Sequence, residues 1–179
     1  MVASNLHQRA LADARLRVDS AARIAEENAL KVFETNTALL ALVADALGDD
    51  SENQLRARER SLHEQMVRIT ANLRHLQGLF VMGPSGQMIA NNRAFPAPAV
   101  DVSDRAFFRH HRQGGTQPFF TEVLTSRTTG EPFFDMSLRR NRPGSGEMTA
   151  VLSASLAPQY FADFYRDLAA KDRDLNIEL

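Results

Sequence analysis

One long stretch without a helix-breaking residue constrains this chain more than any other feature. Residues 4–47 contain neither glycine nor proline and are rich in Ala, Leu, Glu and Arg, which favour helix. Leu11, Val18, Ala25, Val32 and Leu39 recur every seven residues, which predicts a narrow apolar seam on a helix about 65 Å long. The seam fits either a parallel dimer or packing against another helix of the same chain.

The remaining sequence changes from helical to strand-like patterning. A second helix is predicted from Ser51 to Gln77, because Ser51 and Gln54 have the spacing of a capping box and Gly78 supplies a stop. Strands are predicted at residues 79–82, 87–91, 119–123, 131–140 and 148–156, a short helix at 104–113 capped by residues 101–104, and a final helix at 158–171. Strands joined largely as hairpins predict an α+β fold with a five-stranded antiparallel sheet flanked by helices. A lobe of this size cannot cover the first helix along its whole length, so part of that helix must protrude, dimerise or connect to something else.

Composition excludes several classes of function. The 179 residues carry 21 basic and 22 acidic side chains, a balance that does not favour nucleic acid as a partner. Cysteine is absent, which excludes disulfides, thiolate metal sites and cysteine nucleophiles. The sequence shows neither a run of about 18 apolar residues nor a signal-peptide core. We therefore expect either a cytosolic protein or a soluble piece of a larger one.

Four segments, in order, resemble the extracytoplasmic Cache sensor domains, which have a PAS-like fold. They are Gly86–Ala90, Asp101–Arg112, Gly130–Arg140 and Val151–Tyr165. Cache domains form the periplasmic ligand-binding parts of bacterial histidine kinases, diguanylate cyclases and chemoreceptors. The resemblance covers about residues 78–166, and the long first helix fits by position, since in such receptors it emerges from a membrane span.

The resemblance implies a division of the chain and a function. Residues 1–50 would form a signalling or dimerisation helix, residues 51–172 the Cache lobe, and residues 173–179 a tail where a second lobe begins or has been trimmed. The chain would be the periplasmic sensor of an inner-membrane receptor of the histidine kinase or diguanylate cyclase type. It would bind a small anionic metabolite and relay binding through the first helix, and it would not itself be an enzyme. Homodimerisation through that helix, and membrane attachment only through flanking segments, are also implied.

Arg105 is the leading candidate for ligand binding. Cache sensors for amino acids carry an arginine, one intervening residue and an aromatic residue, and Arg105 and Phe107 resemble this pattern, with Phe108 next to them. A guanidinium binds a carboxylate through two parallel hydrogen bonds. The alternative is that Arg105 pairs with Asp101 or Asp104.

Polar side chains within two predicted strands are the other candidates. Asp135 and Ser137 share one strand face, and a carboxylate inside a strand is unfavourable unless it is paired or solvated. Ser153 and Ser155 share a face of the last strand, where Cache sensors for amino acids place an acidic residue, so an anionic or neutral ligand is favoured. All four residues could instead lie on a solvent-exposed face of the sheet.

The sequence gives little support for a metal site, a catalytic nucleophile or a bound cofactor. The adjacent His110 and His111 would point to different sides of a helix, so we expect no metal site. No nucleophile elbow or phosphate-binding loop occurs, and no cofactor is expected. The alternative to a sensor is a dimerisation or spacer module that binds no ligand.

Overall fold

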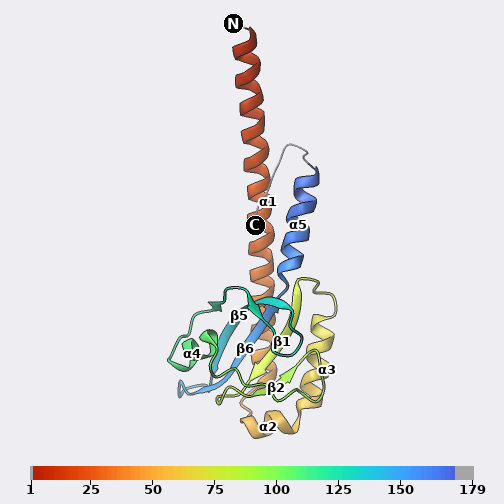
Figure 1. Cartoon of the computed structure of the whole chain (residues 1–179). Coiled ribbons are helices and arrows are strands. Elements are labelled where there is room, and N and C mark those ends of the chain that lie inside the picture. The colour runs from red at the N-terminus through yellow and green to blue at the C-terminus, as the bar shows by residue number, and fades with distance from the viewer. Residues whose placement is uncertain (1, 172–179) are drawn as a thin grey trace. The chain divides into compact units, whose positions relative to one another are not determined.

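The structure is a computed structural model that describes residues 2–171. Its helices are α1 (Val2–Leu47), α2 (Glu52–Ala57), α3 (Glu59–Thr70), α4 (Ala106–Arg112) and α5 (Pro158–Lys171). Its strands are β1 (Leu76–Met82), β2 (Met88–Asn91), β3 (Phe119–Phe120), β4 (Leu124–Thr125), β5 (Pro132–Asn141) and β6 (Met148–Leu156) (Figure 1). The tail predicted at residues 173–179 lies outside the described residues.

The chain forms two compact units. One, called the lobe below, comprises residues 35–158, and the other contains residues 2–34 and 159–171. α1 passes from one unit to the other without a break, so its last residues, from Thr35 to Leu47, belong to the lobe.

The lobe is an antiparallel sheet with the strand order β2-β1-β6-β5-β3, and β4 pairs with β5 beside β3. This confirms the α+β class, the antiparallel sheet and the long first helix, with one more strand than predicted. The third predicted strand, residues 119–123, is shortened to β3, and β4 follows it as a strand that the sequence did not predict. Between them Thr121 pairs with Asp135: its backbone N–H donates to the Asp135 carbonyl, and its hydroxyl accepts the Asp135 N–H at 2.8 Å.

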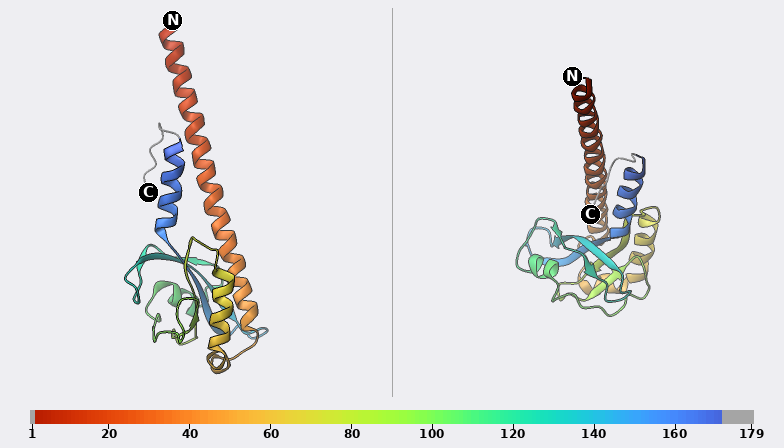
Figure 2. Two further views of the ribbon diagram at one scale, coloured as in Figure 1. Left: turned by 90° about the vertical axis from the view of Figure 1, so that its right-hand side faces the viewer. Right: turned by 45° about the horizontal axis from the view of Figure 1, so that its top comes forward.

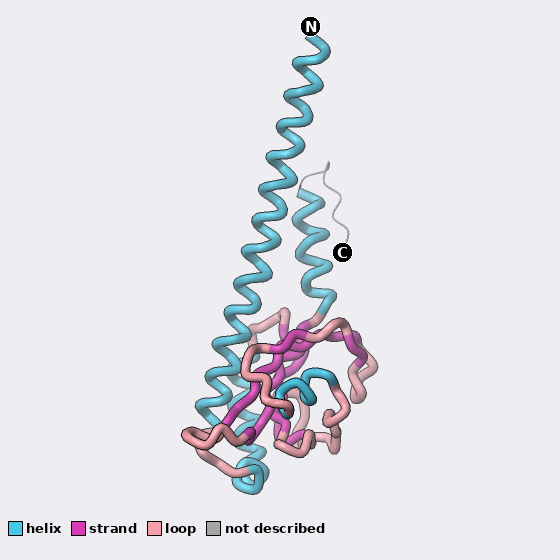
Figure 3. The backbone as a smooth tube through the Cα atoms, turned by 90° about the vertical axis from the view of Figure 1, so that its left-hand side faces the viewer, coloured by secondary structure: helices cyan, strands magenta, loops and turns pink. Residues whose placement is uncertain are grey.

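The two faces of the sheet carry different layers. One face packs against the end of α1 and against α2 and α3, and its core includes Leu40, Leu47, Leu79 and Met136. The other face carries α4 and the loops around it, as Figure 3 shows for the short helix in front of the strands. A smaller apolar cluster fills this second layer and includes Phe107, Phe108 and Val102. Alternation along each strand therefore sends neighbouring residues into different layers.

The second helix is shorter than the sequence predicts. The capping box at Ser51 and Gln54 is confirmed, but the helix is divided at Arg58 and ends at Thr70. Gly78 does not stop a helix and lies inside β1. A Cβ atom added there would lie 2.4 Å from Cζ of Phe80, so only glycine leaves room for that ring.

Arg58 connects the end of α1 to the rest of the lobe. The Arg58 guanidinium donates to the carbonyls of Ala46 and Leu47, the last residues of α1, at 2.7 and 3.1 Å. It also pairs with Asp50 at 2.6 Å. Carbonyls in the last turn of a helix lack intrahelical partners, and a cation there is favourable.

The second unit contains most of α1 and all of α5 but Pro158, and the two helices run side by side in the views of Figure 2. Of the predicted seam, Val32 is buried, whereas Leu11 and Val18 are 48% and 51% exposed. In α5, Phe161 is buried and its ring contacts those of Tyr160 and Tyr165, as expected for a packing face.

Candidate functional site

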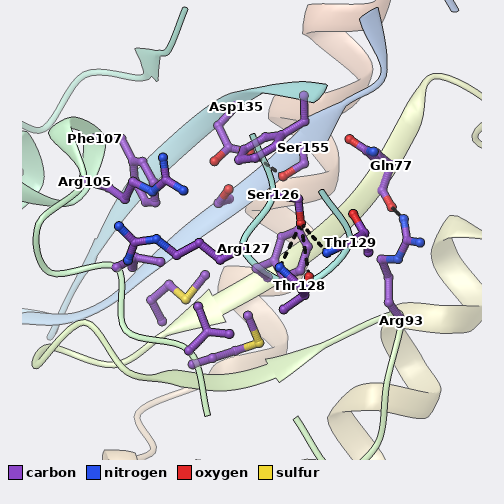
Figure 4. A pocket seen from close by; sticks show the side chains of 17 residues that line it. Gln77, Arg93, Arg105, Phe107, Ser126, Arg127, Thr128, Thr129, Asp135 and Ser155 are labelled. Atoms are coloured by element: carbon purple, nitrogen blue, oxygen red, sulfur yellow. Dashed lines mark hydrogen bonds between the residues drawn. The ribbon is translucent and has the colours of Figure 1, made fainter. Parts of the chain in front are cut away.

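A cavity lies in the lobe on the face of the sheet that carries α4 (Figure 4). Its empty volume is about 630 Å³ including open solvent at its mouth, and the centres of water molecules can occupy about 80 Å³. The walls include the apolar side chains Phe80, Met82, Met88, Val102 and Phe107.

The floor of the cavity is polar and buried. Asp135 on β5 stands directly opposite Ser155 on β6, and both line the cavity. Asp135 is only 3% exposed, and the Ser155 hydroxyl donates to its Oδ1 at 2.5 Å. Ser153, two residues before Ser155, also lines the cavity. Within residues 2–171 its Oγ is buried without a hydrogen-bond partner, although it lies close enough to help lower the pKa of Asp135. The solvent-exposed alternative for these three residues is therefore wrong.

Burial changes the acidity of Asp135. Loss of hydration raises the pKa of this carboxyl from 3.8 to about 6, because the charged form is disfavoured away from water. The hydroxyls of Ser155 and Ser153 and the positive charge of Arg105 act in the opposite direction. A buried carboxylate beside an unpartnered hydroxyl can bind a ligand group that donates hydrogen bonds.

Ser137 continues the polar row along β5 but does not line the cavity. It stands opposite Ser153, and its Oγ lies 3.0 Å from Nε2 of the fully buried His111. Nδ1 of His111 lies 3.0 Å from the Gly115 carbonyl, so Nδ1 donates and the neutral ring accepts from Ser137. Burial lowers the pKa of His111, which favours this neutral form. Ser137 thus holds α4 on the sheet.

Arg105 immediately precedes α4 and lines the cavity. Its Nη2 donates to the Thr125 carbonyl at 3.1 Å. The alternative pairing with Asp101 or Asp104 is not observed, because Arg127 takes Asp104. The residues predicted to cap α4 do not cap it. The Asp101 side chain accepts the Ser103 N–H, and Arg105 occupies the N-cap position but its side chain makes no capping hydrogen bond.

Arg127 is a cavity residue that the sequence analysis missed. Its guanidinium donates to the Asp101 carbonyl and to Asp104 Oδ2, both at 2.6 Å. It belongs to a segment, residues 124–131, that we call the strap. Four consecutive strap residues, from Ser126 to Thr129, line the cavity. No local pattern in the sequence links the strap to residues 101–104, which lie more than twenty positions earlier.

The predicted site residues divide into two groups. Lining the cavity are Arg105, Phe107, Asp135, Ser153 and Ser155. Phe108 is fully buried in the apolar cluster beneath α4, and Ser137 is bound to His111, so neither is among the lining residues. Within residues 2–171, no group of three or more His, Asp or Glu side chains is placed to bind a metal.

Similar folds occur among extracellular sensor domains. The extracellular domain of rpHK1S-Z16, assigned to the histidine kinases, matches with a TM-score of 0.66 and 25% identity over 78% of this chain and 56% of that one. The ligand-binding domain of the Campylobacter jejuni chemoreceptor Tlp3, in complex with 4-methylisoleucine, matches with a TM-score of 0.64 and 10% identity over 85% and 60%. That of the Pseudomonas aeruginosa PAO1 amino acid chemoreceptor PctC, in complex with GABA, matches with a TM-score of 0.56 and 17% identity over 83% and 64%.

The chain has the fold of a Cache-type sensor domain. It spans 56–64% of the length of these three solved chains. No protein-family model and no curated protein sequence matches it. In the described part of this Cache-like chain, no helix is both long and apolar enough to cross a bilayer.

Proposed function

We propose that the lobe is the extracytoplasmic ligand-binding domain of a bacterial membrane receptor and that its cavity binds a small carboxylate-bearing metabolite. One observation carries this proposal: the cavity brings the cationic side chain of Arg105 together with a buried acidic floor and apolar walls. Pockets with few polar groups on apolar walls are typical of small-molecule sites.

Arg105 would bind the carboxylate of this ligand. Its one hydrogen bond within the described chain, to the Thr125 carbonyl, uses Nη2. The guanidinium has four further N–H donors, so it can engage a carboxylate and still hold Thr125. Phe107, the second residue of α4, would contact the apolar part of the ligand.

Asp135 and Ser153 would bind the other end of the ligand. A carboxylate and an unpartnered hydroxyl together favour an ammonium or hydroxyl group rather than a second carboxylate. An amino acid or hydroxy acid therefore suits the cavity better than an anionic ligand that lacks such a group. The Tlp3 and PctC complexes hold 4-methylisoleucine and GABA, which supports the same class of ligand.

A thermal-shift screen tests this function. L-isoleucine, L-arginine, GABA, lactate and succinate would each be added to the protein, and a ligand that binds the folded state raises the melting temperature. We expect a shift with at least one amino or hydroxy acid, its loss in Arg105→Ala, and its retention in Arg109→Ala. Arg109 is the matched control, because it is exposed on α4, one turn after Arg105, and does not line the cavity. An equal shift in Arg105→Ala would remove Arg105 from the site.

We also propose that α1 forms a homodimer through its exposed seam residues and carries the signal. Leu11 and Val18 lie one heptad apart, and both are about half exposed. Apolar residues repeated at this spacing form the seam of parallel coiled coils. Multi-angle light scattering of Leu11→Glu/Val18→Glu tests this point, and an unchanged mass for the variant would refute it. The ligand-free spacer alternative is less well supported, because the cavity is not filled by side chains.

A further inference from the structure

The strap forms part of the cavity wall. Residues 126–129 line the cavity, while Arg127, Thr128 and Thr129 are also solvent-exposed. The floor residues Asp135 and Ser153, in contrast, are almost fully buried. A shift of the strap would therefore change the width of the cavity above the floor.

Only a short strand joins the backbone of the strap to the sheet. Its strand, β4, has only two residues, and these pair with Phe133 and Pro132 of β5. The turn that follows is closed locally, since the Ser126 hydroxyl accepts the N–H groups of Thr128 and Thr129. Such a segment can move as a unit, because its internal hydrogen bonds do not depend on the rest of the lobe.

Polar contacts fasten the strap on both sides of the cavity. Toward α4, Arg127 binds Asp104 and the Asp101 carbonyl, and Arg105 donates to the Thr125 carbonyl. Toward β1, Gln77 donates to Glu131 Oε2 at 3.1 Å, and Arg93 lies 4.0 Å from the same oxygen. Figure 4 shows Arg127 and Arg93 on different sides of the strap turn.

The contact between Arg127 and Asp104 is short but solvent-exposed. The two side chains are 42% and 64% exposed, and their atoms lie 2.6 Å apart. Exposed ion pairs contribute little and weaken as salt rises. The pair is therefore strong enough to bias the position of the strap and weak enough to break often.

We propose that residues 124–131 form a gate over the cavity and that the ion pair between Arg127 and Asp104 is the latch that keeps the gate closed. The gate controls access to the site assigned under the proposed function, and in that respect it rests on that function. Its opening needs no ligand and can be measured without one.

Trypsin offers a direct assay of opening. Arg127 is the only Lys or Arg between Arg112 and Arg139, so cleavage after it yields a distinct pair of fragments. Trypsin takes an arginine side chain into its specificity pocket, and Arg127 must first release Asp104 and the Asp101 carbonyl. The rate of cleavage after Arg127 then reports the open population.

The test variant is Asp104→Asn, which keeps Arg127 and removes the charge of the latch. We expect cleavage after Arg127 to become about two- to fivefold faster, the range that exposed ion pairs imply. The matched control is Glu147→Gln, which breaks the exposed pair between Arg142 and Glu147 away from the cavity and should leave the rate unchanged. Moderate salt should accelerate cleavage of the wild type more than that of Asp104→Asn.

Amide hydrogen exchange of the full chain gives a second measurement. We expect faster exchange at Thr128 and Thr129 in Asp104→Asn, with unchanged exchange in β6. Equal cleavage and equal exchange in Asp104→Asn and the wild type would overturn the latch. Because no ligand is present in either assay, this result would leave the proposed function untouched, whereas a failed thermal-shift screen would leave the latch untouched.

Discussion

Replacement of Asp135 by asparagine should stabilise the ligand-free lobe at neutral pH. The carboxyl is 3% exposed, and burial raises its pKa to about 6 from an ordinary value of 3.8. The folded state thus holds the proton more tightly than the unfolded chain. By linkage, the folded state loses stability as the pH rises from about 3.8 to about 6, and the loss is complete above that range.

The size of the effect follows from the two pKa values. A difference of one pH unit corresponds to 1.36 kcal/mol, so the interval from 3.8 to about 6 corresponds to about 3 kcal/mol. Asparagine has a similar shape, carries no charge, and its carbonyl oxygen can still accept from Ser155. At about 2–4 °C per kcal/mol, the melting temperature should rise by about 6–12 °C at pH 7.5.

Urea unfolding of the wild type and Asp135→Asn at several pH values is the assay. The two proteins should have similar stability near pH 3.5 and diverge toward pH 7, with the variant more stable. Asp163→Asn is the control, because Asp163 is exposed and pairs only with its own helix in the described chain. Equal stability at pH 7, or a less stable variant, would refute the reasoning that an uncompensated charge is buried on the cavity floor.

Other substitutions separate packing from binding. Ser153→Ala should weaken ligand affinity about five- to tenfold and lower the ligand-free stability only slightly, because its hydroxyl has no hydrogen-bond partner within the described residues but helps to lower the pKa of Asp135; calorimetry checks the affinity. Ser137→Ala should do the opposite, costing about 1–2 kcal/mol in urea unfolding without changing affinity, since it breaks the bond to His111. Gly78→Ala should push the Phe80 ring toward the cavity and lower affinity more than stability; equal losses of both would contradict this.

Local patterns in the sequence predicted most of the elements and which residues share a face of β5 and of β6. The alternation in β5 and β6 correctly grouped Asp135, Ser137, Ser153 and Ser155 on one face. Alternation could not predict which of these residues line the cavity. The position of α4 on the sheet decides this, because His111 of α4 is hydrogen-bonded to Ser137. Ser137 therefore lies outside the cavity, whereas Ser153, which stands opposite it on β6, lines the cavity.

Long-range contacts account for what the sequence analysis missed. The helical spacing of residues after Thr70 resembles that of α3, yet Leu76 and Gln77 join β1, because β6 offers hydrogen bonds along its edge. Arg127 lies in a polar turn with no motif, and only the fold brings it to Asp104. Local propensity says little about such pairs, since tertiary contacts decide them.

A crystal structure of the protein with the amino or hydroxy acid that gives the largest thermal shift would test the central claim most directly. We predict that the ligand lies in the cavity, with its carboxylate on Arg105 and its ammonium or hydroxyl group within hydrogen-bond distance of Asp135 and Ser153. A ligand bound elsewhere, or in the cavity without contact to Arg105 or Asp135, would contradict the account.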